Sequence, residues 1–117
     1  MAKLTIQIFD TSRGRPAAGV ALELHRLHED RRELLIRGLT SNEGRNHSPL
    51  LADGTMQKGL YELDFRVGDY FATLGIGLPE PRFLDIISLR FGIADASVDL
   101  HIPLLISPYG YSVGRGS

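Results

Sequence analysis

Apolar and polar residues alternate with a period of two along most of the chain, which is typical of β-strands buried on one face. The pattern is clearest in residues 60–67, LYELDFRV, whose inner side is expected to hold Tyr61, Leu63, Phe65 and Val67. The other segments predicted to form strands are residues 4–10, 20–27, 33–40, 83–92, 97–107 and 109–117. The sequence therefore predicts seven or eight short strands.

Residues that favour tight turns separate these segments. Gly14, Pro16 and Gly19 lie between the first two. In the turn SNEGR, Asn42 and Gly44 are expected to take positive φ at low cost. Short strands joined by such turns are typical of a two-sheet β-sandwich, so we expect an all-β fold in one domain that spans all 117 residues.

The alternation breaks in residues 68–77, GDYFATLGIG, where the sequence predicts one short helix. Asp69 is expected to cap the start of this helix. Gly75 or Gly77 is expected to end it after Leu74.

Residues 97–107 have an apolar face and a second face of unusual composition. The first face, expected to lie in the core, holds Val98, Leu100, Ile102, Leu104 and Ile106. The opposite face holds Asp99, His101, Pro103, Leu105 and Ser107. The first strand likewise presents Phe9 beside Thr5 and Gln7 on its outer face. Apolar residues outside the core indicate a second buried surface, formed by subunit association.

The charge balance limits the range of partners. With 13 basic and 14 acidic residues the net charge is −1, so neither nucleic acid nor an anionic membrane is an expected partner. The chain has no cysteine, which excludes disulfides and thiolate metal sites. The N-terminal residues enter a strand pattern directly, without an apolar run of signal-peptide or membrane-spanning length, so we expect a cytoplasmic protein.

The residues alone leave the chemistry open. His101 is either a surface histidine or a functional group, and Arg45 is either an exposed turn arginine or a ligand-binding one. His25, His28 and His47 lack a third ligand in the pattern, so we expect no metal site. The sequence shows no nucleophile elbow, phosphate-binding loop or Ser-His-Asp order.

Four stretches together resemble the transthyretin-like family: LTIQIFDTSRGRPAAGV near the start, TSNEGR, GLYELDFRVGDYF and the ending HIPLLISPYGYSVGRGS. The resemblance covers essentially the whole chain. It implies a two-sheet sandwich of eight strands with a short helix after the fifth, assembled as a homotetramer, a dimer of dimers. In this family the first and seventh strands lie side by side in the sheet that lines a channel between the dimers. The active sites of the enzymatic branch, 5-hydroxyisourate hydrolase, lie in that channel.

The resemblance also assigns functional residues by position. It implies that His101, Arg45 and Ser117 are catalytic. The residues that it places around the substrate are Gln7, Arg45, Gly114, Arg115 and Gly116. Two positions depart from the family pattern, because its first-strand histidine is Gln7 here and the tyrosine of its terminal Tyr-Arg-Gly-Ser is Gly114.

The implied reaction adds water to a ring carbonyl of 5-hydroxyisourate and opens the ring without a cofactor. His101 is the candidate base, because imidazole titrates at about pH 6.5, and Arg45 is the candidate for binding the anion and the oxyanion. Gln7 forms hydrogen bonds, but its amide neither gains nor loses a proton near neutral pH. If the family histidine is an acid or base, its loss costs roughly 10²–10⁴ in rate. We therefore expect a hydrolase of a small cyclic amide or ureide, and the alternative is a non-catalytic tetrameric small-molecule binding protein like transthyretin.

Overall fold

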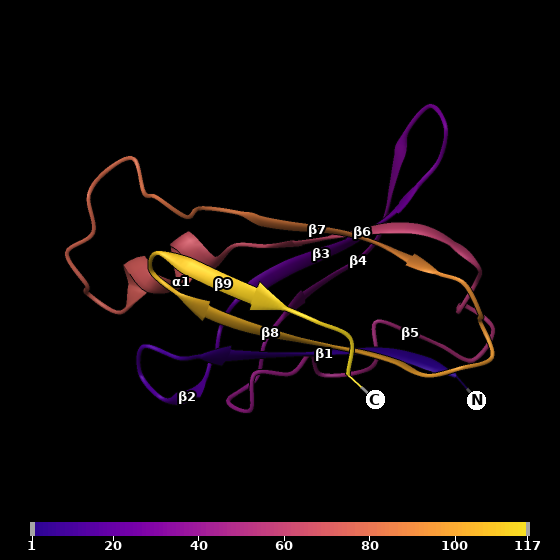
Figure 1. The fold of residues 1–117 in the computed structure, drawn as a ribbon, viewed down its shortest axis with the longest axis horizontal. Helices are drawn as coiled ribbons and strands as arrows, with labels where there is room; N and C mark the ends of the chain where they lie inside the picture. Colours follow the sequence, from indigo (N-terminus) through magenta and orange to yellow (C-terminus); the bar gives the residue numbers. More distant parts are fainter. Residues whose placement is uncertain (1, 117) are drawn as a thin grey trace.

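Two β-sheets pack face to face in the computed structural model, which describes residues 2–116 (Figure 1). The described residues contain one helix, α1 (Val67–Thr73). The strands are β1 (Lys3–Asp10), β2 (Arg15–Pro16), β3 (Ala21–Leu27), β4 (Arg32–Leu39), β5 (Leu51–Ala52), β6 (Gly59–Phe65), β7 (Ile87–Ile93), β8 (Leu100–Ser107) and β9 (Gly110–Val113). This arrangement confirms the predicted all-β sandwich with a short helix.

The two sheets differ in the direction of their strand pairs. Sheet A has the order β2-β1-β8-β9, with β5 also paired to β1, and sheet B has the order β4-β3-β6-β7. The pair β1 and β8 is parallel, with Leu4 opposite Leu100 and Thr5 opposite His101, whereas the other strand pairs are antiparallel. Segments from the two ends of the chain therefore lie side by side at the centre of sheet A (Figure 1).

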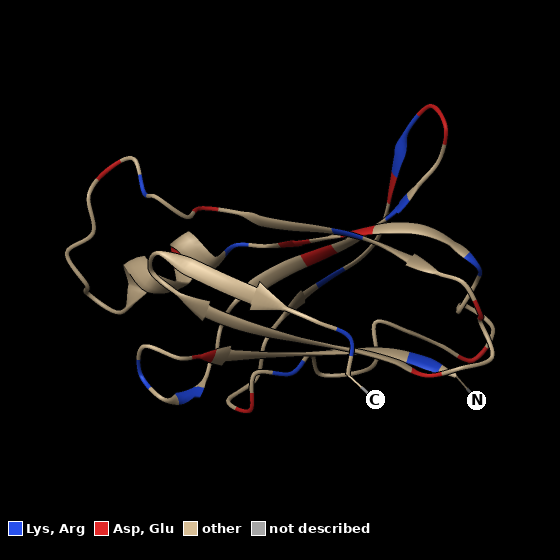
Figure 2. Ribbon diagram, in the orientation of Figure 1, with Lys and Arg blue, Asp and Glu red and all other residues tan. Residues whose placement is uncertain are grey.

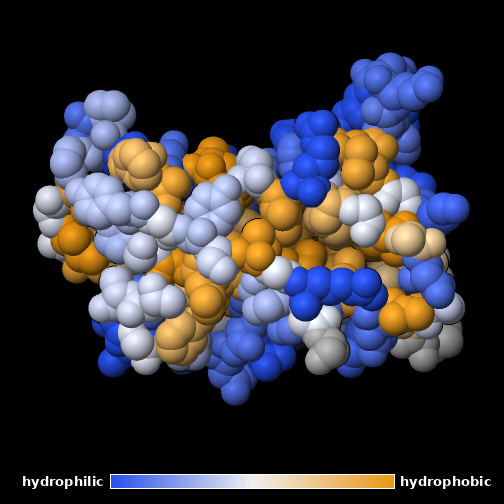
Figure 3. Space-filling model, in the orientation of Figure 1, coloured by the Kyte–Doolittle hydropathy of each residue, from blue (hydrophilic) through white to orange (hydrophobic). Residues whose placement is uncertain are grey.

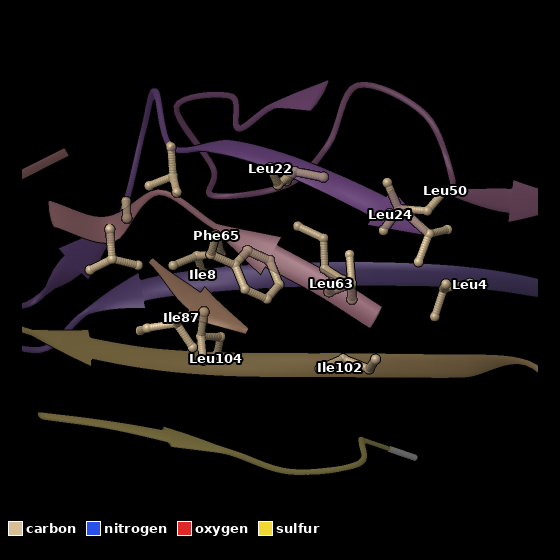
Figure 4. Packing of buried hydrophobic residues seen from close by; sticks show 14 of the residues in the cluster. Leu4, Ile8, Leu22, Leu24, Leu50, Leu63, Phe65, Ile87, Ile102 and Leu104 are labelled. Atoms are coloured by element: carbon tan, nitrogen blue, oxygen red, sulfur yellow. The ribbon is translucent and has the colours of Figure 1, made fainter. Parts of the chain in front are cut away.

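The space between the sheets is filled by the apolar residues of the alternating pattern (Figure 4). Sheet A contributes Leu4, Ile6 and Ile8 from β1, and sheet B contributes Leu63 and Phe65 from β6; all are at most 2% exposed. Burying one such side chain contributes about 1.5–3 kcal/mol relative to exposing it. The period of two thus determines which face of each strand lies outside the core and is available for a functional site.

The prediction that Val98 belongs to the core is wrong, because this side chain is 46% exposed and precedes β8. The backbone N–H and the hydroxyl of Ser97 both donate to Asp95 Oδ1, at 2.9 and 2.6 Å. Side-chain bonds of this kind stabilise a turn rather than a strand. The pairing with β1 begins only at Leu100, so the alternating residues before it do not belong to a sheet.

The predicted cap of the helix is also wrong. The helix begins at Val67, one turn earlier than expected, and its N-cap residue makes no side-chain capping bond. Asp69 lies in the first turn and accepts a hydrogen bond from Arg82 Nη1 at 2.7 Å. The N–H of Gly68 donates instead to the carbonyl of Asp85 at 2.8 Å. The predicted end is confirmed, because Gly75 follows the C-cap residue with a φ of +71°.

The surface between β7 and β9 is apolar. Figure 3 shows hydrophobic side chains reaching the surface along the middle of this face, where a hollow is lined by Phe91, Ile102 and Val113 among others. Neither β8 nor β9 carries a charged residue (Figure 2). None of the helical structure described is long and apolar enough to cross a membrane.

Candidate functional site

The parallel pairing of β1 and β8 collects polar side chains on the outer face of sheet A. Thr5 lies opposite His101 and Gln7 opposite Pro103. All four are half-buried, because their neighbours in sequence point into the core. The predicted placement of Gln7 and His101 on one outward face is therefore confirmed.

The imidazole of His101 is held by Thr5, whose Oγ1 lies 2.8 Å from Nδ1. The sequence places Thr5 on this face but gives it no role. A hydrogen bond at Nδ1 leaves Nε2 as the ring nitrogen available to a ligand. The pair is thus a histidine with a fixed orientation.

A tight turn brings Arg45 against β1. The N–H of Ile8 donates to the carbonyl of Gly44 at 2.8 Å, and Gln7 and Arg45 form a β-bridge. Gly44 has a φ of +75°, and a Cβ there would lie 2.2 Å from Ile8 O. Only glycine fits this close approach in the left-handed region. Gly44 behaves as predicted, whereas Asn42 does not take positive φ.

Gln7 links this turn to the site. Its Oε1 accepts a hydrogen bond from Arg45 Nη2 at 3.4 Å, and its Nε2 donates to the carbonyl of Glu43 at 3.2 Å. An amide is suited to both bonds because it has a donor and an acceptor on one planar group. Gln7 therefore orients the guanidinium of Arg45 in this chain.

The chain after β9 returns to His101. The N–H of Gly116 donates to the carbonyl of His101 at 2.7 Å, and the N–H of Gly114 lies 3.4 Å from the carbonyl of Pro103. A Cβ on Gly116 would lie 2.9 Å from the His101 ring, whereas one on Gly114 would meet nothing within 4 Å. Position 116 is thus tightly packed and position 114 is open.

One of the predicted residues, Arg115, is not brought to this face. Arg115 lines the hollows between β7 and β8, with Gly92 and Leu100, away from Thr5 and Arg45. Ser117 lies outside the described residues.

A further histidine, His47, borders the site. It lines a hollow of about 110 Å³ together with Thr5 and Arg45. From the sequence, His47 was a candidate only as a metal ligand. The sequence did contain one indication of its place near the site. His47 lies two positions after Arg45, so both residues are close to the turn that contacts β1.

The outer face of sheet A therefore combines an oriented imidazole, a guanidinium and a glutamine amide. Such groups can take a proton, hold an anion and donate hydrogen bonds to a developing oxyanion. A cluster of groups able to bind a metal lies elsewhere, on sheet B, at Glu23, His25 and Asp64.

The fold defines a prealbumin-type β-sandwich protein, and this polar face is a candidate ligand site on the outside of one sheet. The profile of the HIUase/Transthyretin family, where HIUase stands for 5-hydroxyisourate hydrolase, matches residues 4–116. The chain belongs to this family.

Its relatives include enzymes named for one reaction. The 5-hydroxyisourate hydrolase 2 of Rhizobium meliloti is 49% identical over 115 residues, which cover 98% of this chain and 96% of that protein. The 5-hydroxyisourate hydrolase of Ralstonia nicotianae is 44% identical over 117 residues and the full length of both. The structure of Klebsiella pneumoniae 5-hydroxyisourate hydrolase matches with a TM-score of 0.82, at 32% identity and full coverage of both chains.

Proposed function

We propose that the protein is a 5-hydroxyisourate hydrolase. The observation that carries this proposal is the meeting of His101, Arg45 and Gln7 on one face, in a chain 44–49% identical to proteins of that name. The names of these relatives support hydrolysis over a non-catalytic small-molecule carrier. In the reaction, water adds to a ring carbonyl, the C–N bond breaks and the ring opens.

His101 is the base in this proposal. Nε2 takes a proton as water attacks the carbonyl carbon, and the same proton then goes to the leaving ring nitrogen. A basic Nε2 requires that the Nδ1 proton be donated to Thr5 Oγ1, at the observed 2.8 Å. Thr5 is therefore a positioning residue.

Arg45 holds the anionic substrate and the oxyanion that forms on its carbonyl. Gln7 keeps the guanidinium in place through its amide oxygen. We also assign substrate contacts to Gly114 and Gly116, because the bond from Gly116 to the His101 carbonyl holds this segment beside the base. Arg115 keeps a substrate contact in this proposal only by the family resemblance. Ser117 stays a catalytic residue only by the family resemblance.

We further propose that the protein is a homotetramer whose sites lie between subunits. Exposed apolar side chains on and near the outer face of sheet A support this assembly: Leu105, Tyr109 and Tyr111. Light scattering after size exclusion tests it, and a monomer would contradict it. The cytoplasmic location predicted from the sequence stays a prediction.

The activity is tested by following the absorbance of freshly generated 5-hydroxyisourate with and without the protein. We expect acceleration well above spontaneous decay, and a loss of roughly 10²–10⁴ in His101→Asn. His28→Asn is the matched control, because His28 pairs with Glu33 at the surface, away from the site. A wild-type protein that does not accelerate the decay would overturn the proposal.

A further inference from the structure

The outer face of sheet B, on the opposite side of the sandwich from His101, carries a compact cluster of metal-binding groups. Glu23 and His25 lie two residues apart on β3, so they point to the same side, and Asp64 of β6 lies directly opposite Glu23. One donor atom from each of the three lies within 4.8 Å of the others. Figure 2 shows acidic and basic residues close together on this sheet.

His25 is a buried side chain without a hydrogen-bond partner. Its side chain is 7% exposed, and Nδ1 has no partner among the described residues. Nε2 is directed at the cluster but lies 3.6 Å from Glu23 Oε1, which is too far for a hydrogen bond. No hydrogen bond among the described residues occupies Nε2, so the ring nitrogen on the side of the carboxylates is available to bind a cation.

The spacing of the donors suits a small divalent cation. Zinc binds histidine nitrogen at about 2.0–2.1 Å and carboxylate oxygen at about 2.0–2.2 Å, which places tetrahedral ligands about 3.4 Å apart. The 3.6 Å between His25 Nε2 and Glu23 Oε1 is close to that value. A nitrogen with two carboxylate oxygens is a donor set that zinc accepts.

Neighbouring side chains hold both carboxylates, and in Glu23 they leave one oxygen without a hydrogen bond. Arg37 Nε donates to Glu23 Oε2 at 2.9 Å, so Oε1 remains on the His25 side. Ser88 Oγ donates to Asp64 Oδ1 at 2.7 Å. Hydrogen bonds of this kind orient carboxylates that bind metals.

Arg32 is the group that competes with the ion. Its Nη1 lies 3.3 Å from Asp64 Oδ2 and 3.3 Å from Glu62 Oε1, and its side chain is 47% exposed. Arg32 therefore keeps a partner in Glu62 when Asp64 turns to a metal. Glu62 is itself buried beneath Arg32 and Arg90.

We propose that Glu23, His25 and Asp64 bind one zinc ion, with water in the fourth position. No metal site was expected from the sequence, because the histidines lack a third ligand in the pattern. Glu23 lies beside His25 along β3, whereas Asp64 joins them only through the register of β3 and β6. The site is independent of the proposed hydrolysis and lies on the other sheet.

Zinc binding is measured on the full chain, stripped with chelator, by competition with a chromophoric chelator. We expect one Zn²⁺ per subunit and a Kd at least tenfold weaker in Glu23→Gln and in Asp64→Asn, which keep the size of each side chain. Arg32→Gln should bind more tightly, because the competing cation is gone. Cobalt substitution should give the visible bands of a tetrahedral site in the wild type and lose them in Glu23→Gln.

Two controls separate this site from the other histidines. His28→Asn and His101→Asn should leave the stoichiometry and Kd unchanged. Zinc binding that disappears in His101→Asn but survives in Glu23→Gln would overturn the proposal and place the ion on sheet A. A wild-type protein that binds zinc no more tightly than Asp64→Asn would also overturn it, and the cluster would then be a network of ion pairs alone.

Discussion

Thr5 Oγ1 lies 2.8 Å from Nδ1 of His101, because β1 and β8 pair in parallel with these two residues opposite each other. The contact joins residues 96 positions apart in the chain. It connects the base of the proposed reaction to the central strand of the sheet, so the orientation of the imidazole depends on strand register.

Replacing Thr5 by valine keeps the shape of the side chain and removes the hydroxyl. We expect kcat for 5-hydroxyisourate to fall about tenfold, since one hydrogen bond to the base is lost, with a smaller change in KM. Thr5→Ser should restore most of the rate, because it returns the hydroxyl to Nδ1. A Thr5→Val enzyme with the wild-type kcat would refute the positioning role.

Replacing Gln7 by leucine removes both the acceptor for Arg45 and the donor to Glu43. The guanidinium is then free to leave the substrate, so we expect KM to rise about tenfold with less effect on kcat. Gln7→His supplies a titratable group in place of the amide. If it raises kcat, the proton chemistry of the site is incomplete with glutamine; an unchanged kcat would show that His101 suffices.

Gly44→Ala should distort the turn that holds Arg45. A Cβ at this position lies 2.2 Å from Ile8 O at a φ of +75°, so the clash adds to the roughly 1–2 kcal/mol cost of a left-handed residue. We expect the free energy of unfolding in urea to fall by more than about 2 kcal/mol. Gly14→Ala is the control, because its φ is +66° but nothing lies within 4 Å of its Cβ. Equal losses in the two variants would contradict the role of the close approach.

The buried hydroxyl of Tyr70 should make the stability of the protein depend on pH in the alkaline range. Its hydroxyl donates to Asp10 Oδ2 at 2.8 Å in the core. Burial, followed by the hydrogen bond to Asp10 and the charge of that residue, raises the pKa of Tyr70 above its ordinary value of 10.0. The folded state therefore holds this proton more tightly than the unfolded state, so the stabilisation is complete below about pH 10 and is lost as the pH rises further.

Urea unfolding between pH 8 and pH 11 measures this effect. Tyr70→Phe should be less stable at neutral pH by about 1–2 kcal/mol, because the hydrogen bond to a carboxylate is lost. Its stability should also fall less steeply above pH 10 than that of the wild type. Parallel curves for the two proteins would exclude Tyr70 as the titrating group.

The sequence predicted the faces of the long strands because burial of one face imposes a period of two, as in β1 and β6. It misplaced Val98 and the start of α1 for one reason. In both places side-chain and backbone bonds to distant or turn residues, such as Asp95 and Asp85, decide where an element begins. A pattern of hydrophobicity contains no information on these bonds.

The site was predictable only in part. Alternation placed Gln7 and His101 on the outer sides of their strands. The family resemblance set these two strands side by side and supplied Arg45. The role of Thr5 depends on the register of β1 with β8, which the sequence does not specify. Arg115 was expected at the site from its position in the motif, yet the backbone after β9 directs it towards the β7 side.

The order of the strands in the chain has a consequence for protein synthesis. Sheet B is complete once Ile93 has left the ribosome, but β1, made first, waits for its central partner until Ser107 has emerged. During that interval one apolar face of β1 lacks the strand that completes its sheet, and chaperones recognise such exposed segments. The enzyme's own chemistry is therefore a property that a nascent chain acquires late, because the surface that carries it joins β1 to β8, which is translated after every strand of sheet B.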